Sequence, residues 1–511
     1  MILAKAMDYN RQQVSREDGS YYNLVEMKVK DSSTIDFAKL ENKNWQQKLF
    51  DTAHIRLLKA AARGVEKPLV IVWAAYDHQR AAGEYFPDLL AGAAEEYLSL
   101  NALITEKLRA LIKSKNYLIR NNRLKVKDKN SETAEAAKII SLLEKEQRLK
   151  IYQTEPELSD QEIYQALDYK RDLAAVGEIA YPSAYSRQHQ YPLAFNCSYF
   201  LLEEADWESK YSLLGDHYGL LISAGQIISP PLYKRSALLK TEANEWKLKK
   251  VFLTDLSIQL QNREWDLSKF KVNENADYSL YTRQYGVETK NKALGITPKA
   301  KGKIEIVIIN DLIVGIKKGG KTEIPQNAFI LSLPEEEFDF DSNLVKKVKY
   351  KFNNGEKYRS AVQTGPLLVK NGDLRLDHNS LKAEDFCGQS SQIERAQFER
   401  VVPTDYADDI DQTRAARLAA GVNYKNEFCL LAVESVNTGM EAGEESSGAT
   451  LLELAEWAHK RNYKYALNLD GGGSANIQYL YGSLFKTADR RGLPGVVYER
   501  MVPTIGFISK L

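Results

Sequence analysis

An aspartate and three glycines end an apolar run near the C-terminus, in the stretch YALNLDGGGS that closes at Ser474. Glycines let a ligand approach the backbone, so the N–H groups from Gly471 to Ser474 could together bind an anion. The carboxylate of Asp470 would repel this anion unless it faced another part of the same ligand, a metal or a cation. The stretch predicts a site for a phosphate-bearing molecule, and the alternative is a tight structural turn.

A second carboxylate and two arginines occur close to another apolar run, FCLLAV at 428–433. Glu434 follows this run, and Arg414 and Arg417 precede it. An arginine fork can hold a phosphate diester through two parallel hydrogen bonds. These residue types predict a site that binds a phosphate diester beside two carboxylates, and the alternative for each arginine is an ordinary surface position.

The elements around these residues predict how they meet. Residues 428–433 and 465–469 are short buried strands, and 450–462 is an amphipathic helix with serines before it as candidate caps. A strand, a helix and a second strand make a βαβ unit with parallel strands. Ligands bind beyond the carboxyl ends of such strands, so we expect Glu434 and Asp470 at one edge of the sheet.

The rest of the chain divides near residue 180. Helical spacing of apolar residues is found at 44–63 and 87–115, and a capping box starts a further helix at 158–173. Between them, 68–77 is a candidate strand and 122–132 a charged, mobile loop. Strand signals dominate after 185, with hairpin turns at 310–311 and 371–372.

We therefore expect an α+β fold. Its mixed sheet would be flanked by helices, contain the C-terminal βαβ unit and follow a mainly helical N-terminal region. The expected domains are 1–180 and 185–511, with a possible insertion at 232–300.

Composition narrows the class of partner. The 511 residues are 44% hydrophobic, and Lys+Arg 70 balances Asp+Glu 69, so we expect no nucleic-acid or membrane partner. Neither a signal peptide nor an apolar run of about 18 residues is evident. The expected location is the cytoplasm, or association with a phage or its host by a route without a signal. The cysteines and histidines show no metal-ligand spacing, so no metal site is predicted.

One stretch imitates a nucleotide-binding loop. GIKKGGKT, at 315–322, fits the P-loop pattern, which must open a helix. Pro325 and a strand-like run follow instead, so we interpret the stretch as a turn between strands.

Seven blocks together resemble the phosphodiester glycosidase family over about 185–511, in the order found there. They are FNCSYF, GLLISAGQIISPP, IPQNAFILSL, QTGPLLVKNGDL, RLAAGV, SGATLLELAEWA and ALNLDGGGSANI. The resemblance implies hydrolysis of the bond between a sugar C1 and a phosphodiester oxygen. It implies catalytic roles for Asp470 and Glu434. The residues expected to bind substrate or phosphate are Arg417, Arg414, Asn196, Thr364, Gly365, Gly471, Gly472, Gly473 and Ser474.

The chain departs from the family at two points. Cys197 and Ser198 replace the two glycines that usually follow the asparagine, and Glu434-Ser435-Val436 replaces the usual Asp-Gly-Arg. A non-catalytic glycan-binding or sugar-phosphate-binding protein, such as a phage particle component, stays an alternative, as does an actin/sugar-kinase-like ATP-binding domain. We expect a small-molecule or glycan substrate with a sugar-1-phosphate linkage and no required cofactor. A divalent cation at the carboxylate edge is left open, and the oligomeric state is not predicted.

Overall fold

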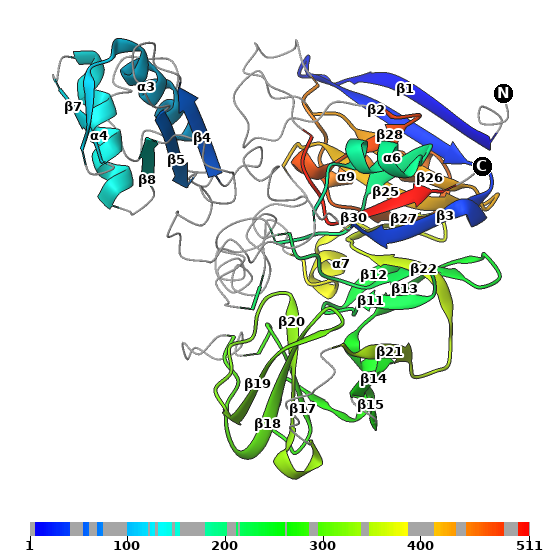
Figure 1. Cartoon of the computed structure of the whole chain (residues 1–511). Coiled ribbons are helices and arrows are strands. Elements are labelled where there is room, and N and C mark those ends of the chain that lie inside the picture. Colours follow the sequence, from blue (N-terminus) through cyan, green and yellow to red (C-terminus); the bar gives the residue numbers. More distant parts are fainter. Residues whose placement is uncertain are drawn as a thin grey trace. The chain divides into compact units, whose positions relative to one another are not determined.

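The computed structural model shows a mainly β protein with few helices (Figure 1). The expected α+β fold with a helical N-terminal region is therefore wrong. The chain enters its first sheet at Met7, and strands recur in the N-terminal region that was expected to be mainly helical. The structure describes residues 6–40, 55–60, 69–74, 100–120, 123–127, 131–145, 149–153, 179–201, 211–212, 215–260, 263–285, 295–338, 347–386, 413–435, 446–484 and 499–509.

The chain forms two compact units. The first consists of Met1–Glu41, Gly177–Asp489 and Val497–Leu511, and the second of Asn42–Val176 and Arg490–Val496. The N-terminal strands thus belong to the same unit as the glycine-rich motif, and each of the two segments of the second unit interrupts the chain of the first.

A seven-stranded sheet carries the glycine-rich motif, and the N-terminal strands lie beside the C-terminal ones in it (Figure 1). Strand β2 pairs antiparallel with β26, so that Val25 faces Ala432. Local sequence could not reveal this pairing because the partners come from opposite ends of the chain. In sheet order the strands are β1 (Met7–Ser15), β2 (Tyr21–Val29), β26 (Phe428–Val433), β25 (Arg417–Asn423), β27 (Tyr463–Asn468), β23 (Leu367–Lys370) and β24 (Asp373–Leu374).

One face of this sheet is covered by the main hydrophobic core and the other by helix α9 (Leu451–Lys460). Thr450 caps the helix in place of the expected serines, and its hydroxyl accepts a hydrogen bond from the Glu453 N–H at 3.2 Å. The core also holds apolar side chains of a five-stranded sheet. That sheet contains β29 (Gly482–Ser483), β28 (Ile477–Tyr479), β9 (Leu193–Asn196), β30 (Thr504–Ile508) and β3 (Ile35–Lys39).

Among its described residues, the first unit also contains three further sheets and two short α-helices. Strands β18 and β19 form the hairpin expected at 310–311, and β23 and β24 the one at 371–372. Six of the eight residues of GIKKGGKT, Gly315 to Gly320, belong to strand β19, so its interpretation as a turn is wrong for them. The next regular element is strand β20 rather than a helix, so the stretch lacks the helix that a P-loop must open. The elements are α6 (Pro182–His189), β10 (Leu221–Ser223), β11 (Gln226–Ser229), β12 (Arg235–Thr241), β13 (Trp246–Val251), β14 (Leu256–Leu260), β15 (Arg263–Asp266), β16 (Lys271–Val272), β17 (Ser279–Thr282), β18 (Lys299–Ile309), β19 (Leu312–Gly320), β20 (Ala328–Pro334), β21 (Lys349–Phe352), β22 (Tyr358–Gln363) and α7 (His378–Ala383).

The described part of the second unit contains a three-stranded sheet, a hairpin and two helices around their own core. The strand expected at 68–77 is confirmed, but 55–60 is a strand rather than a helix. The expected loop at 122–132 instead contains a strand and the start of a helix. The helix expected at 158–173 lies outside the described residues. The elements are β4 (Ile55–Ala60), β5 (Leu69–Ala74), α3 (Leu100–Ser114), β6 (Tyr117–Arg120), β7 (Arg123–Val126), α4 (Ser131–Lys145) and β8 (Leu149–Gln153).

Candidate active site

Three strand ends meet at one edge of the seven-stranded sheet. Strand β25 lies between β26 and β27 and is antiparallel to both, so the expected pairing of β26 with β27 is wrong. The two outer strands nevertheless run in the same direction. Arg417, at the start of β25, therefore lies at the edge where Glu434 and Asp470 follow β26 and β27.

The loop that carries Asp470 is fixed by backbone hydrogen bonds on both sides. Its N–H donates to the Cys197 carbonyl at 3.0 Å, and the Gly472 N–H donates to the Ala416 carbonyl at 2.7 Å. The Asn196 amide donates to the Asp470 carbonyl at 2.6 Å. The side chain of Asn196 therefore positions the loop, rather than facing away from it.

Thr364 and Gly365 support the same loop from its other end. The Thr364 hydroxyl donates to the Asn468 carbonyl at 2.6 Å, and the Gly365 N–H donates to it at 3.1 Å. Gly365 has a φ of +97°, and a Cβ there would come within 2.9 Å of Phe386. These residues fix the end of β27, which leads directly into Asp470.

The carboxyl group of Asp470 is half-buried, and its ionisation is shifted toward neutral pH. Burial raises its pKa to about 7, against the positive charge of Arg500 and hydrogen bonds at Ser474 and Gly471, which lower it. A carboxyl group in this range can exchange protons near pH 7, as a general acid or base requires.

Arg500 is a site residue that the sequence interpretation missed. Its guanidinium donates to the Ser474 hydroxyl at 3.1 Å and is the cation that acts on Asp470. A lone arginine distant from any motif gives no signal in sequence. The link forms only because β30, which follows it, enters the second sheet beside β9.

Arg417 and Arg414 have different surroundings. Arg417 is buried, and its guanidinium donates to the carbonyls of Ala449 at 3.1 Å and Thr413 at 2.6 Å. Arg414 is exposed and makes two hydrogen bonds of 3.1 Å to Asp18. Of the two expected phosphate-binding arginines, the first thus braces the edge beside the glycine-rich loop, and the second belongs to a surface ion pair.

Glu434 is buried and bound on both carboxylate oxygens. Arg11 donates to one oxygen at 2.9 Å and Asn23 to the other at 2.8 Å. The neighbouring Val433 pairs with Arg417 across the strands. Because successive residues of a strand point to opposite faces, Glu434 and Arg417 leave the sheet on opposite sides.

The glycine-rich backbone uses part of its hydrogen-bonding capacity within the protein. Residues Gly472–Ser474 form a 3₁₀ turn in which the Ser474 N–H donates to the Gly471 carbonyl at 3.1 Å. Gly473 is buried in this turn. Since the Gly472 N–H is also bonded, the expected continuous row of N–H groups facing an anion does not form.

Two buried polar atoms next to the loop have no hydrogen-bond partner among the residues that the structure describes. They are the Ser198 hydroxyl and the Asn468 carbonyl oxygen Oδ1. The Asn468 amide nitrogen donates to the Tyr199 hydroxyl at 2.8 Å. Ser198 thus adds a polar group next to the loop that carries Asp470.

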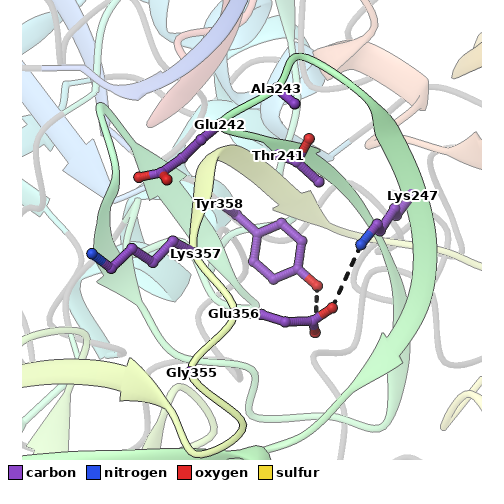
Figure 2. A pocket seen from close by; sticks show the side chains of 8 residues that line it. All are labelled: Thr241, Glu242, Ala243, Lys247, Gly355, Glu356, Lys357 and Tyr358. Carbon is purple, nitrogen blue, oxygen red and sulfur yellow. Dashed lines mark hydrogen bonds and ion pairs between the residues drawn. The ribbon is translucent and has the colours of Figure 1, made fainter.

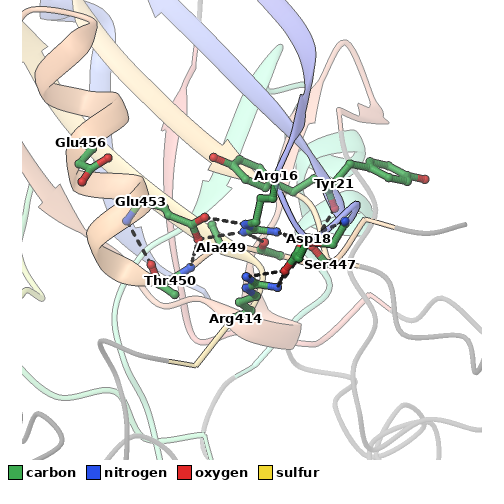
Figure 3. A network of polar contacts seen from close by, with 12 residues as sticks. Arg16, Asp18, Tyr21, Arg414, Ser447, Ala449, Thr450, Glu453 and Glu456 are labelled. Atoms are coloured by element: carbon green, nitrogen blue, oxygen red, sulfur yellow. Dashed lines mark hydrogen bonds and ion pairs between the residues drawn. The ribbon is translucent and has the colours of Figure 1, made fainter. Parts of the chain in front are cut away.

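A network of charges ties the tip of the β1–β2 hairpin to this edge (Figure 3). Arg16 donates to both oxygens of Glu453, at 2.7 and 2.9 Å, and to the Gly448 carbonyl at 2.7 Å. The neighbouring Ala449 accepts from Arg417. Although burial raises the pKa of Glu453, its hydrogen bonds with Arg16 and Thr450 hold it below its ordinary value.

A separate surface cavity of about 320 Å³ lies at the turns before β13 and β22 (Figure 2). Glu356 accepts hydrogen bonds there from Lys249, at 2.8 and 2.6 Å, and from Tyr358 at 2.8 Å. Its carboxylate is thus already bound by side chains of the protein. It shares no lining residue with the Asp470 loop.

In the described part of the chain, His, Cys, Asp and Glu side chains do not gather in groups of three or more that could hold a metal ion. Likewise, none of the described helices is long and apolar enough to cross a membrane.

Fold and loop together define a mainly β protein with a carboxyl group and an arginine at a glycine-rich sheet edge. Residues 302–508 match the model of the phosphodiester glycosidase family. The resemblance seen in the sequence is therefore confirmed for this part of the chain. The match begins after the FNCSYF and GLLISAGQIISPP blocks. Among curated proteins, no relative matches this chain.

Three solved structures share low identity with the chain. A hypothetical protein from Synechocystis is 14% identical, covers 98% of this chain and 80% of its own, and has a TM-score of 0.36. A putative exported protein from Burkholderia pseudomallei is 13% identical, covers 98% of this chain and 96% of its own, and has a TM-score of 0.39. The catalytic domain of zebrafish N-acetylglucosamine-1-phosphodiester α-N-acetylglucosaminidase is 14% identical, covers 57% of this chain and 88% of its own, and has a TM-score of 0.24. Since these scores are low, the similarity to the family rests on residues 302–508.

Proposed function

We propose that the protein hydrolyses the glycosidic bond of a sugar-1-phosphodiester and releases free sugar and a phosphomonoester. The observation that carries the proposal is the half-buried Asp470, whose pKa is about 7, in a loop whose Ser474 hydroxyl binds Arg500. The family match at 302–508 supports the same chemistry.

In the proposed reaction, ionised Asp470 accepts a proton from a water molecule as that water attacks C1 of the sugar. The bond between C1 and the phosphodiester oxygen breaks, and its electron pair leaves with the phosphate. Arg500 stabilises the charge that develops on this leaving group, and cationic stabilisation of this kind is a large catalytic effect. The proton then passes from Asp470 to phosphate or solvent.

We assign Glu434 to positioning, because Arg11 and Asn23 already bind its two oxygens. Together they join β1 and β2 to the end of β26. Asn196, Thr364 and Gly365 would likewise position Asp470 through its backbone, and Arg417 would brace the glycine-rich loop.

The test is incubation with a panel of sugar-1-phosphodiesters, including nucleotide-sugars, with detection of free sugar and phosphomonoester. We expect at least one member to be hydrolysed by the natural chain and not by Asp470→Asn. Equal release by both proteins would contradict the proposed role of Asp470.

A second candidate is sugar-phosphate binding without turnover. It is favoured by Glu434, which replaces the family's aspartate and is bound by Arg11. Calorimetry with the same panel separates the two: binding with no free sugar for any member supports this candidate and overturns the hydrolase.

A further inference from the structure

The second unit carries a strongly basic segment that the proposed reaction does not use. Residues 107–127 contain eight Lys and Arg and no Asp or Glu, although the whole chain has 70 basic and 69 acidic residues. Positive charge is therefore concentrated here rather than spread along the chain. The eight are Lys107, Arg109, Lys113, Lys115, Arg120, Arg123, Lys125 and Lys127.

The β6–β7 hairpin presents part of this charge on one face. Ile119 pairs with Leu124, and these side chains pack against the core of the unit. The alternate pairs, Leu118 with Lys125 and Arg120 with Arg123, therefore point outward. All four outward side chains are exposed. The hairpin thus packs one face on the core and exposes a face that carries positive charge.

The charges on this outer face do not stabilise the fold of the hairpin. Arg120 lies directly opposite Arg123, and like charges in such pairs destabilise a sheet. Within the described residues, neither arginine nor Lys125 forms an ion pair, whereas Lys107 pairs with Glu135 at 3.0 Å. A cation near a helix C-terminus, such as Lys113, has a structural explanation, but the strand cations do not.

We propose that the basic face, defined as Arg120, Arg123 and Lys125, binds the backbone of a phosphodiester-linked glycan polymer. The proposal rests on the proposed function and narrows its substrate class from small sugar phosphodiesters to polymers of them. Such a polymer carries one negative charge per repeat, and arginine binds phosphate diesters through paired hydrogen bonds.

The composition of the basic face favours a glycan over a nucleic acid. Proteins that bind single-stranded nucleic acid stack its bases on aromatic side chains. The outward hairpin positions carry Leu118 and cations, while Tyr117 packs toward the core of its unit. The face therefore offers charge and a small apolar contact without a stacking surface.

The test uses the full chain and a variant that combines Arg120→Ser, Arg123→Ser and Lys125→Ser. A matched control combines Lys301→Ser, Lys349→Ser and Lys425→Ser, which removes the same charge from exposed positions of the first unit. The probes are a polymer of N-acetylglucosamine-1-phosphate repeats, its methyl phosphodiester monomer and single-stranded DNA. Kd is measured for each probe at two salt concentrations.

We expect the hairpin variant to bind the polymer at least about tenfold more weakly, and the control to bind it as the natural chain does. Raised salt should weaken polymer binding by the natural chain. Release of sugar from the monomer should be the same in all three proteins. Unchanged polymer binding by the hairpin variant, or tighter binding of DNA than of polymer, overturns the proposal. Failure of the proposed function is seen separately, as absence of monomer hydrolysis by the natural chain.

Discussion

Asp470 and Glu434 follow two strands that end at the same edge of one sheet, yet their surroundings differ. Glu434 is held by Arg11 and Asn23 on its two oxygens. Asp470 is fixed through its backbone, and burial shifts its carboxyl toward neutral pH. A carboxylate bound by protein groups can support a structure, whereas one with a pKa near 7 can exchange protons. Position in the sheet does not distinguish the two residues, but their partners do.

The largest expected effect comes from removing the titrating carboxyl. Asp470→Asn should lower kcat on a hydrolysed sugar-1-phosphodiester by about 10³-fold or more, because general base catalysis is lost. Steady-state kinetics measures this loss. A decrease in kcat of less than tenfold would mean that another residue is the general base. Asp470 and Glu434 would then not differ in the way proposed.

The stability of Asp470→Asn at two pH values shows whether the variant folds and whether the pKa of Asp470 is raised. A carboxyl whose pKa is raised in the folded state favours folding below its ordinary pKa of 3.8, and this contribution is lost as pH rises toward 7. Asp470→Asn should therefore be more stable than the natural chain at pH 8 and nearly equal to it at pH 4. Thermal unfolding at both pH values measures the difference.

Arg500 should have the next largest effect. Arg500→Gln should lower kcat/KM by about 10²-fold through loss of leaving-group stabilisation. Because the charge of Arg500 lowers the pKa of Asp470, the variant should also shift the rising limb of the pH–rate profile upward from its midpoint near 7. Arg500→Lys keeps the charge and should keep the midpoint. A profile that does not move in Arg500→Gln would contradict the proposed coupling.

Glu434→Gln should change activity less than about tenfold if the residue only positions β26. The free energy of unfolding should fall by about 1–3 kcal/mol, since a buried charged hydrogen bond is lost. Urea denaturation and kinetics on the same preparation separate these effects. A loss of activity as large as that of Asp470→Asn would restore the catalytic role first expected for Glu434.

The smallest effects concern the network at the hairpin tip. Arg16→Ala should lower the free energy of unfolding by about 2 kcal/mol, because its bidentate partner Glu453 is left partly buried. Arg414→Ala should lower it by less than about 1 kcal/mol, because its pair with Asp18 is exposed. Urea denaturation measures both. Equal losses would mean that the buried arginine contributes no more to the edge than the exposed one.

Much of the local structure could be predicted from the sequence. The runs at 428–433 and 465–469 are strands because they are short, apolar and bounded by polar residues, and Thr450 starts a helix between them. The hairpins at 310–311 and 371–372 follow from their turn residues. The prediction of a loop at 122–132 was wrong. The many charged residues there obscure an alternation of buried and exposed side chains, in which Leu124 faces the core.

The sequence by itself determined that a carboxylate and a glycine-rich turn end a buried strand, because side-chain size and polarity act locally. Only the tertiary structure decided which carboxylate is bound by an arginine, that β25 lies between the two strands, and that Arg500 reaches Ser474. These depend on pairings between distant segments, such as β2 with β26 and β9 with β30. Local sequence does not encode such pairings, since each strand could bond to many partners until the shared core selects one.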